Sequence, residues 1–199
     1  MIRRLTTTTR SITPLRSHHH PFSSSSADMA DSKILIYLMR RDLRLSDNPI
    51  FHSLSKDNQG FTHLLPLYVF PAQQVEVSGF IPKDSTAKSP YPEARSPVGA
   101  FWRCGPHRTK FVAEAVWDLK THLQKVNSDL LLRVGMTGEV VQELLRRINE
   151  RNDTSVGAVW MTAEDAVEEK QDEAEVRAAC SEADVRFKLW KDEKYLVDE

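Results

Sequence analysis

The sequence contains little cysteine and no long hydrophobic run. Its two cysteines, Cys104 and Cys180, are too few and too far apart for a disulfide framework or a cysteine-rich metal site, which favours a reducing compartment. No apolar stretch approaches the roughly 18 residues that a membrane-spanning helix requires, so we expect a soluble protein without a membrane partner. The net charge of -1 argues against a chain that binds nucleic acid by bulk electrostatic attraction.

The motifs of several enzyme classes are absent as well. Gly135 and Gly138 lack the spacing of a dinucleotide-binding loop, and no glycine-rich phosphate loop is present. The Gly-x-Ser-x-Gly turn of a hydrolase is missing. Cys104 and His107 are separated by a Gly-Pro break that favours a turn over a catalytic pair, and the histidines follow no metal-ligand pattern. The sequence therefore predicts no catalytic residue and no metal site.

The first 32 residues differ in composition from the rest of the chain. Residues 1–27 contain four arginines and eleven serines or threonines, and the first acidic residue is Asp28. This composition is typical of an organelle transit peptide, and the arginines favour a mitochondrial one. The alternative is a disordered, untargeted tail of a nuclear or cytoplasmic protein, because such polar tracts bury too little apolar surface to fold.

From residue 33 onward, short apolar runs alternate with amphipathic segments. Strands are predicted at 33–39, 63–70, 129–134, 155–161 and 185–190, and helices at 49–56, from 106, from 137 and at 162–183. This rhythm predicts one α/β domain over 33–199, with a doubly wound, Rossmann-like sheet of five parallel strands and helices on both faces. Residues 72–105 are proline-rich without apolar periodicity, and we expect them to form an excursion on the surface.

The helix patterns carry more specific expectations. Asn48 is predicted to cap the helix at 49–56, and Thr137 to cap the helix that follows it. The segment 162–165 resembles a capping box that opens the next helix, whose acidic residues are expected to form a solvated face. The residues expected to face inward are Val167, Ala174 and Ala178 in that helix and Phe111, Val112, Ala115, Val116, Leu119 and Leu123 in the helix from 106.

The order of the strands predicts where a ligand would bind. In the common doubly wound order, the winding reverses between the strands at 33–39 and 155–161, and ligands bind beyond the carboxyl ends of the strands at that reversal. The loops at 40–48 and 162–165 meet there. We therefore expect a ligand-binding crevice between these two loops.

Four charged residues are predicted to surround this crevice, namely Arg40, Asp42, Arg44 and Glu164. The alternative for the first three is that Asp42, Asp47 and the arginines pair only with one another and fix the loop. Glu164 would lie in the first turn of a helix, where the dipole stabilises its charge, and this position also directs it to the crevice.

The segment at 40–48 (Arg-Arg-Asp-Leu-Arg-Leu-Ser-Asp-Asn) resembles the opening of the DNA photolyase and cryptochrome family. Further segments resemble its cryptochrome DASH branch, namely 67–70, 105–111, 130–135 with 138–140, and 187–190 before 195–198. They follow one another in the same order as in the family. The resemblance extends from about Lys33 to Glu199 and leaves out only the N-terminal tail.

This resemblance implies a blue-light flavoprotein of two domains. The α/β domain would bind an antenna chromophore, which in the DASH branch is a reduced folate, methenyltetrahydrofolate. The antenna would pass its excitation to FAD in a larger helical domain, and the flavin would donate an electron that splits a pyrimidine dimer in DNA, the deoxyribodipyrimidine photo-lyase reaction. A family glutamate at the end of the fourth strand contacts the folate, and Glu164 matches this place.

The chain stops at Glu199, where the family continues into the helical domain. We therefore expect no FAD and no catalytic residue in this chain, with that domain as its partner and DNA bound only through the full-length protein. Two other functions stay open. One is a standalone nucleotide- or cofactor-binding module, which would require the phosphate loop that is missing here, and the other is light signalling without repair.

Overall fold

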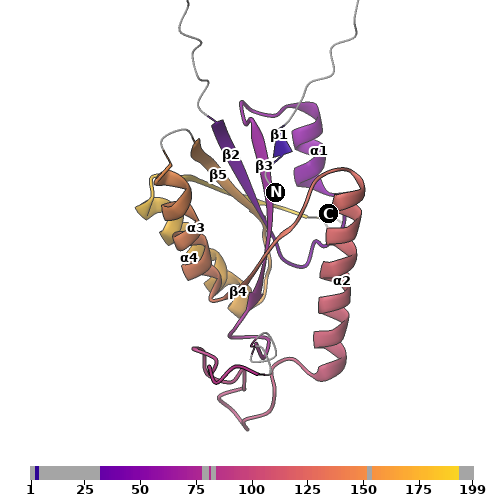
Figure 1. The fold of residues 1–199 in the computed structure, drawn as a ribbon, viewed down its shortest axis with the longest axis vertical. Coiled ribbons are helices and arrows are strands. Elements are labelled where there is room, and N and C mark those ends of the chain that lie inside the picture. The colour runs from indigo at the N-terminus through magenta and orange to yellow at the C-terminus, as the bar shows by residue number, and fades with distance from the viewer. Residues whose placement is uncertain (1–2, 5–31, 78–80, 82–83, 152–153, 193–199) are drawn as a thin grey trace, which may run out of the picture.

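The computed structural model describes residues 3–4, 32–77, 81, 84–151 and 154–192, which form one layered α/β domain (Figure 1). Its elements in chain order are β1 (Arg3–Arg4), β2 (Ser32–Met39), α1 (Pro49–Lys56), β3 (His63–Pro71), α2 (Pro106–Lys125), β4 (Leu131–Gly135), α3 (Thr137–Asn149), β5 (Thr154–Thr162), α4 (Val167–Glu182) and β6 (Arg186–Trp190). Strands β2 to β6 lie within two residues of the five predicted strands.

The sheet is doubly wound. Its parallel strands lie side by side in the order β4-β3-β2-β5-β6, so the winding reverses between β2 and β5 as predicted. Helices α1 and α2 cover one face of the sheet, and α3 and α4 cover the other (Figure 1). The predicted fold class is therefore confirmed.

One strand was not predicted. Strand β1 pairs antiparallel with His63 and Leu64, on the same side of β3 as β4, and makes the sheet six-stranded. The prediction of a wholly unstructured tail did not anticipate this pairing. Ser32 begins β2, and the other residues of the predicted tail lie outside the described residues.

The central strand β2 explains why the domain has two cores. Ile34, Ile36 and Leu38 pack toward α3 and α4, whereas the alternate residues Leu35, Tyr37 and Met39 pack toward α1 and α2. An apolar run on both sides of a strand is what a buried parallel strand requires, because both of its faces are covered by helices. This arrangement places the charged loop after Met39 at the carboxyl edge of the sheet.

The predicted cap of α1 is confirmed and that of α3 is not. The Asn48 side chain caps α1 by accepting hydrogen bonds from the backbone N–H groups of Ile50 (3.0 Å) and Phe51 (3.1 Å), which confirms that prediction. The prediction for α3 was wrong, because Met136 holds the cap position without a side-chain hydrogen bond and Thr137 is the first helical residue.

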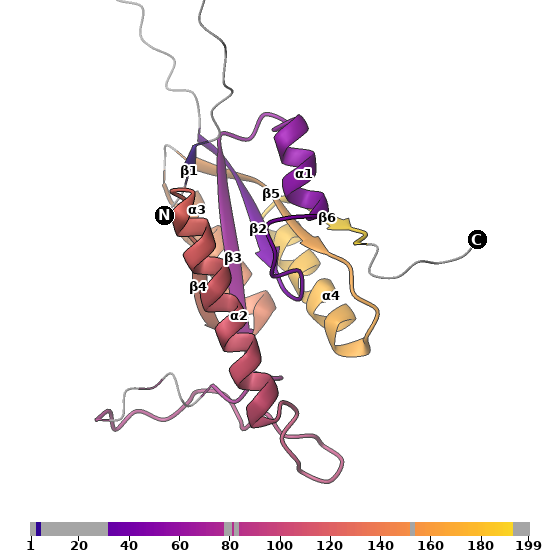
Figure 2. The ribbon, with the colours of Figure 1, turned by 90° about the vertical axis from the view of Figure 1, so that its right-hand side faces the viewer.

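Helix α2 begins at Pro106 as predicted, but its apolar stripe is only partly buried. Val116, Leu119 and Leu123 are buried, whereas the side chain of Phe111 is 70% exposed. Figure 2 shows the reason, since the first turns of α2 continue past the ends of the strands and have no sheet to pack against. The predicted inward position of Phe111 was therefore wrong.

The insert at 72–105 contains no helix and no named strand among its described residues. Near its end, Arg95 and Trp102 form an isolated antiparallel bridge, and the Arg95 guanidinium lies 3.7 Å from the centre of the Trp102 ring. Val75 and Ala94 are buried. The insert is irregular, as predicted, but parts of it pack against the domain instead of forming only a surface excursion.

Gly135 ends β4 at a point where a larger residue would be strained. Its φ angle is 149°, and a Cβ atom there would lie 2.7 Å from the Tyr91 hydroxyl and 3.1 Å from a methyl group of Val140. We expect Gly135→Ala to lower the free energy of unfolding by about 1–3 kcal/mol, measured by urea denaturation. Gly105→Ala is the matched control, because nothing lies within 4 Å of its Cβ position. Equal effects of the two substitutions would contradict this explanation.

Candidate ligand site at the carboxyl edge of the sheet

A cavity of about 360 Å³ lies at the carboxyl edge of the sheet. Its walls come from the ends of β2 and β3, the loop after β2, the first turns of α2 and α4, the first residue of α3, and residues near both ends of the insert. Since α2 and α4 cover opposite faces, the cavity extends across the edge of the sheet from one face to the other. Apolar side chains such as Leu38, Leu43 and Val112 line it together with arginines and carboxylates.

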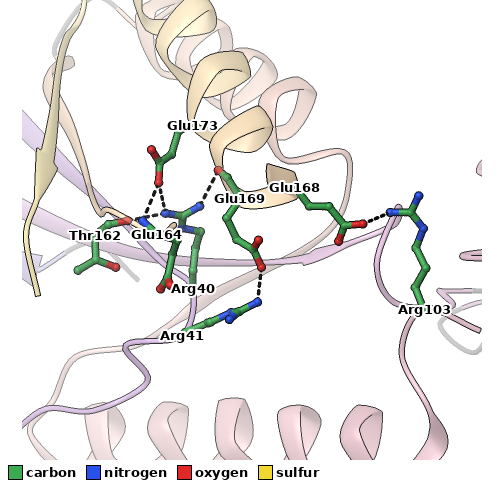
Figure 3. Close-up of polar contacts among 8 residues, drawn as sticks. All are labelled: Arg40, Arg41, Arg103, Thr162, Glu164, Glu168, Glu169 and Glu173. Carbon is green, nitrogen blue, oxygen red and sulfur yellow. Dashed lines mark hydrogen bonds and ion pairs between the residues drawn. The ribbon is translucent and has the colours of Figure 1, made fainter. Parts of the chain in front are cut away.

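Arg40, the first residue after β2, joins the two loops that were predicted to meet. Its guanidinium donates to the backbone carbonyl oxygens of Thr162 (2.5 Å) and Glu169 (3.1 Å) and forms an ion pair with Glu173 (2.7 Å). Figure 3 shows the Glu173 carboxylate pointing at Arg40 from α4. The side chains of Arg40 and Glu173 are each only 11% exposed, so this is a largely desolvated pair.

Two further arginines hold the first turns of α4 at the cavity. Arg41 forms an ion pair with Glu169, and Arg103 from the end of the insert forms one with Glu168 (Figure 3). Pairs of this kind stabilise a carboxylate that would otherwise lose its hydration at the sheet edge. The insert is thereby tied to the mouth of the cavity.

The predicted solvated face of the acidic helix was therefore wrong in part. Glu169, Asp172 and Glu173 are buried, because Arg40, Arg41 and the side chain of Gln73 approach them from other segments. The apolar positions were also predicted incorrectly. The residues that face inward are Val176, Ala179 and Cys180, whereas Ala174 and Ala178 are exposed and Val167 is 83% exposed.

The predicted capping box does not form. Strand β5 runs through Thr162, which pairs with Trp190, and the backbone N–H of Ala163 donates to the Trp190 carbonyl oxygen (2.8 Å). This continued pairing delays the start of α4 to Val167, with Ala166 at the cap position and no side-chain cap. Glu164 is therefore in the β5–α4 connection instead of a first helical turn, and its backbone N–H donates to Glu173 Oε1 (2.9 Å).

Asp42 lies inside the loop. Its side chain is fully buried, Oδ1 accepts the Arg40 backbone N–H (2.8 Å), and Oδ2 accepts the Tyr37 hydroxyl. Tyr37 in turn accepts a hydrogen bond from the Asn48 side chain (2.7 Å). Burial, with the Asp42 carboxylate beside it, raises the pKa of Tyr37 far above its usual range, so its hydroxyl stays a donor. Both carboxylate oxygens of Asp42 are used to fix the loop.

Arg44 has different partners from Arg40. Its guanidinium contacts both carboxylate oxygens of Asp192 after β6 (2.7 and 2.9 Å) and the backbone carbonyl oxygen of Asp47 (2.9 Å). Of the four residues predicted at the crevice, only Arg40 lines the cavity. Glu164 lies beside it through their shared partner Glu173, whereas Asp42 and Arg44 have the loop-fixing contacts of the alternative interpretation.

Several cavity residues were not singled out as site residues from the sequence. They include Tyr68, Arg103, Arg108, Glu169 and Asp172. For Tyr68 a signal was available, because it lies near the carboxyl end of a predicted strand next to the central one. The acidic residues gave no such signal, since their partners lie far away in the sequence.

Asp172 makes the stability of the domain depend on pH. Burial raises its pKa from 3.8 to about 6, although the nearby positive charge of Arg40 acts in the opposite direction. An acid with a raised folded-state pKa destabilises the fold when it ionises, so the cost is absent near pH 4 and complete above about pH 6.

We expect Asp172→Asn to be more stable than the wild type by about 2 kcal/mol at pH 8, with the difference disappearing toward pH 4. Asparagine keeps an acceptor for the Gln73 amide, which donates to Asp172 at 2.6 Å. Urea denaturation of both proteins between pH 4 and 8 measures the effect. A difference that does not change with pH would show that ionisation of Asp172 is not its cause.

Among the residues that the structure describes, no group of three or more His, Cys, Asp and Glu side chains has an arrangement that could hold a metal ion. No helix in the same part of the chain has both the length and the apolar composition needed to cross a bilayer.

Comparison with known proteins assigns the chain to a family. The sequence model of the DNA photolyase family matches residues 35–198. The chain belongs to the DNA photolyase family. It is 54% identical to a cryptochrome DASH from Neurospora crassa described as mitochondrial, over 85% of this chain and 23% of that protein. It is 48% identical to a cryptochrome DASH from Gibberella zeae, over 86% of this chain and 24% of that protein.

Within this family the chain is therefore similar to cryptochrome DASH proteins, and it spans about a quarter of the length of these two curated relatives. Solved structures show the same fold. The cryptochrome of Synechocystis superposes with a TM-score of 0.62 at 21% identity, over 80% of this chain and 27% of that chain. The archaeal photolyase of Sulfolobus tokodaii, solved with two FAD molecules, gives 0.57 at 18% identity, over 79% and 29%.

Proposed function

We propose that this domain binds the antenna chromophore of a cryptochrome DASH-type blue-light flavoprotein. The observation that carries the proposal is the cavity at the carboxyl edge of the sheet, which Arg40 borders beside the reversal between β2 and β5. Ligands of doubly wound sheets bind at such a reversal. The Sulfolobus tokodaii photolyase gives further support, since its structure with two FAD molecules implies a novel light-harvesting cofactor in that protein.

The lining of the cavity suits a flat conjugated molecule. Leu38, Met39 and Val112 offer apolar surface for a ring system, and arginines and carboxylates of the same lining offer polar contacts. A reduced folate, methenyltetrahydrofolate, is the chromophore that we propose. In this proposal Glu164 accepts hydrogen bonds from N–H groups of the pterin, and Arg40 positions Glu164 through Glu173, while Asp42 and Arg44 hold the loop that carries Arg40.

The role of the whole protein follows from the same proposal. The antenna would transfer its excitation to FAD in a helical domain packed against this one, and the full-length protein would repair pyrimidine dimers in DNA in the light. We also propose a mitochondrial location. The arginine-rich first residues and the mitochondrial description of the Neurospora crassa relative support it.

Titration with methenyltetrahydrofolate tests the chromophore proposal. We expect the 199-residue chain to bind it no more tightly than about millimolar, roughly 4 kcal/mol, because one domain encloses only part of the ligand. Glu164→Gln should weaken binding about tenfold, as expected for losing one hydrogen bond to a charged group. Chromophore fluorescence, with and without the helical domain of the Neurospora crassa relative, measures the affinity.

The control for this experiment is Glu150→Gln, which removes an exposed carboxylate at the end of α3, far from the cavity. It should bind like the wild type. If Glu164→Gln also binds like the wild type, Glu164 does not contact the folate. If no folate binds even with the helical domain present, the folate itself is the wrong chromophore.

A further inference from the structure

Tyr68 presents an unused polar group to the cavity. Its side chain projects from β3 toward α2, packs edge-on against Phe70 with ring centres 5.0 Å apart, and is only 6% exposed. The hydroxyl has no hydrogen-bond partner among the described residues, although Tyr68 lines the cavity. The Tyr68 oxygen is not among the fully buried unpartnered atoms of the described residues, so the hydroxyl opens to the cavity and can donate to a group bound there.

The first turn of α2 lies at the same end of the cavity. Gly105 holds the cap position without a side-chain hydrogen bond, and the first turn contains no acidic residue. Because Pro106 has no N–H, the first free donors are the backbone N–H groups of His107 and Arg108. The start of a 20-residue helix also carries positive partial charge, which favours an anion.

Arg108 adds a full positive charge at this point. It lines the cavity, its charge acts on the Tyr68 hydroxyl, and it forms no ion pair with any residue that the structure describes. An arginine in the first turn of a helix is repelled by the positive partial charge of the helix N-terminus. A bound anion would be attracted by both the arginine and the helix dipole. The thiol of Cys104 lines the same end of the cavity.

The acidic residues of the cavity lining, Glu168, Glu169 and Asp172, all belong to α4. Glu168 and Glu169 are paired with Arg103 and Arg41, and Asp172 accepts a hydrogen bond from Gln73. The charges of Glu168 and Glu169 are therefore compensated by arginines, whereas burial disfavours the charged form of Asp172. The cavity residues that belong to α2 include Arg108 and no acidic side chain. We call this part of the cavity, together with Tyr68 and the first turn of α2, the α2 end.

We propose that the α2 end of this cavity binds a phosphate or carboxylate group, with the Tyr68 hydroxyl, the Arg108 guanidinium and the first N–H groups of α2 as donors. The proposal rests on the proposed function only for the identity of the complete ligand, whose ring system would fill the apolar middle of the cavity. The ligand class is therefore a flat molecule whose end bears a phosphate or carboxylate.

Titration of the ¹⁵N-labelled 199-residue chain with inorganic phosphate, against potassium chloride at equal ionic strength, tests the site. We expect saturable shifts of the His107 and Arg108 amide signals, because these N–H groups are the proposed backbone donors. Tyr68→Phe, which keeps the ring, and Arg108→Gln should each weaken phosphate binding about tenfold. Arg151→Gln, which removes an exposed arginine outside the cavity, should bind phosphate like the wild type.

A parallel titration with acetate separates the two sources of the anion. Tighter binding of phosphate assigns a phosphate ester, and equal or tighter binding of acetate assigns a carboxylate. The proposal is overturned if phosphate and acetate both give no saturable shift, or if the Tyr68 and Arg108 variants bind as the wild type does. These readouts involve no chromophore, so a failure here leaves the folate titration unaffected, and the reverse also holds.

Discussion

Arg40→Met is expected to lower the free energy of unfolding by about 3–5 kcal/mol, because it leaves a buried carboxylate without its partner. Glu173 is buried and its carboxylate also accepts the backbone N–H of Glu164, so it cannot turn to water without breaking the β5–α4 connection. The carbonyl oxygens of Thr162 and Glu169 lose their donor as well. Urea denaturation followed by tryptophan fluorescence measures the change.

The control is Arg147→Met, which breaks an ion pair between an exposed arginine and Glu143 on α3. It should change the stability much less, because exposed ion pairs contribute little. The double variant Arg40→Met with Glu173→Met should recover part of the loss, since it removes both buried charges. If the double variant is as unstable as the sum of the two single ones, the loss does not come from the unpaired carboxylate.

Asp42→Ala is expected to cost about 3 kcal/mol or more. It leaves two buried donors without an acceptor, the Tyr37 hydroxyl and the Arg40 backbone N–H, and each such group costs about 1–3 kcal/mol. The effect reaches α1, because Tyr37 also accepts a hydrogen bond from Asn48, the residue that caps this helix. Asp42→Asn keeps one acceptor and should lose less.

Asp47→Asn in the same loop is the matched control for this series. Asp47 is exposed and has a φ angle of 51°, a conformation that asparagine adopts readily, so its stability should be close to that of the wild type. The variants are compared by urea denaturation at one pH. A loss for Asp42→Ala no larger than that for Asp47→Asn would show that the buried network contributes no stability.

The fold could be predicted because its signals are local. The run at 33–39 is hydrophobic at every position after Lys33, and the Asn48-Pro49 pair marks the start of α1 by hydrogen bonding and fixed φ alone. The reversal of the winding followed from the order of strands and helices. Strand β1 had no such signal, because it is two residues long and consists of two arginines.

The site was harder to predict because its contacts join distant segments. The apolar periodicity of α4 predicted that Val167 is buried and the acidic residues are exposed. In the structure Val167 is exposed, whereas Glu169 and Glu173 are buried beside Arg41 and Arg40. The capping box predicted at 162–165 does not form, because Thr162 pairs with Trp190 in the sheet. Local propensity fails at these places because ion pairs and strand pairing decide the structure.

The ion pairs around α4 also determine when the cavity can exist during folding. Arg40 meets its partners across 122 to 133 residues of sequence, and Arg103 meets Glu168 across 65. Contacts of such separation form only after long loops have closed, which makes them late events. A chain in which α4 has not yet packed against the loop after β2 therefore lacks the complete cavity. Ligand binding would show that α4 has packed against this loop.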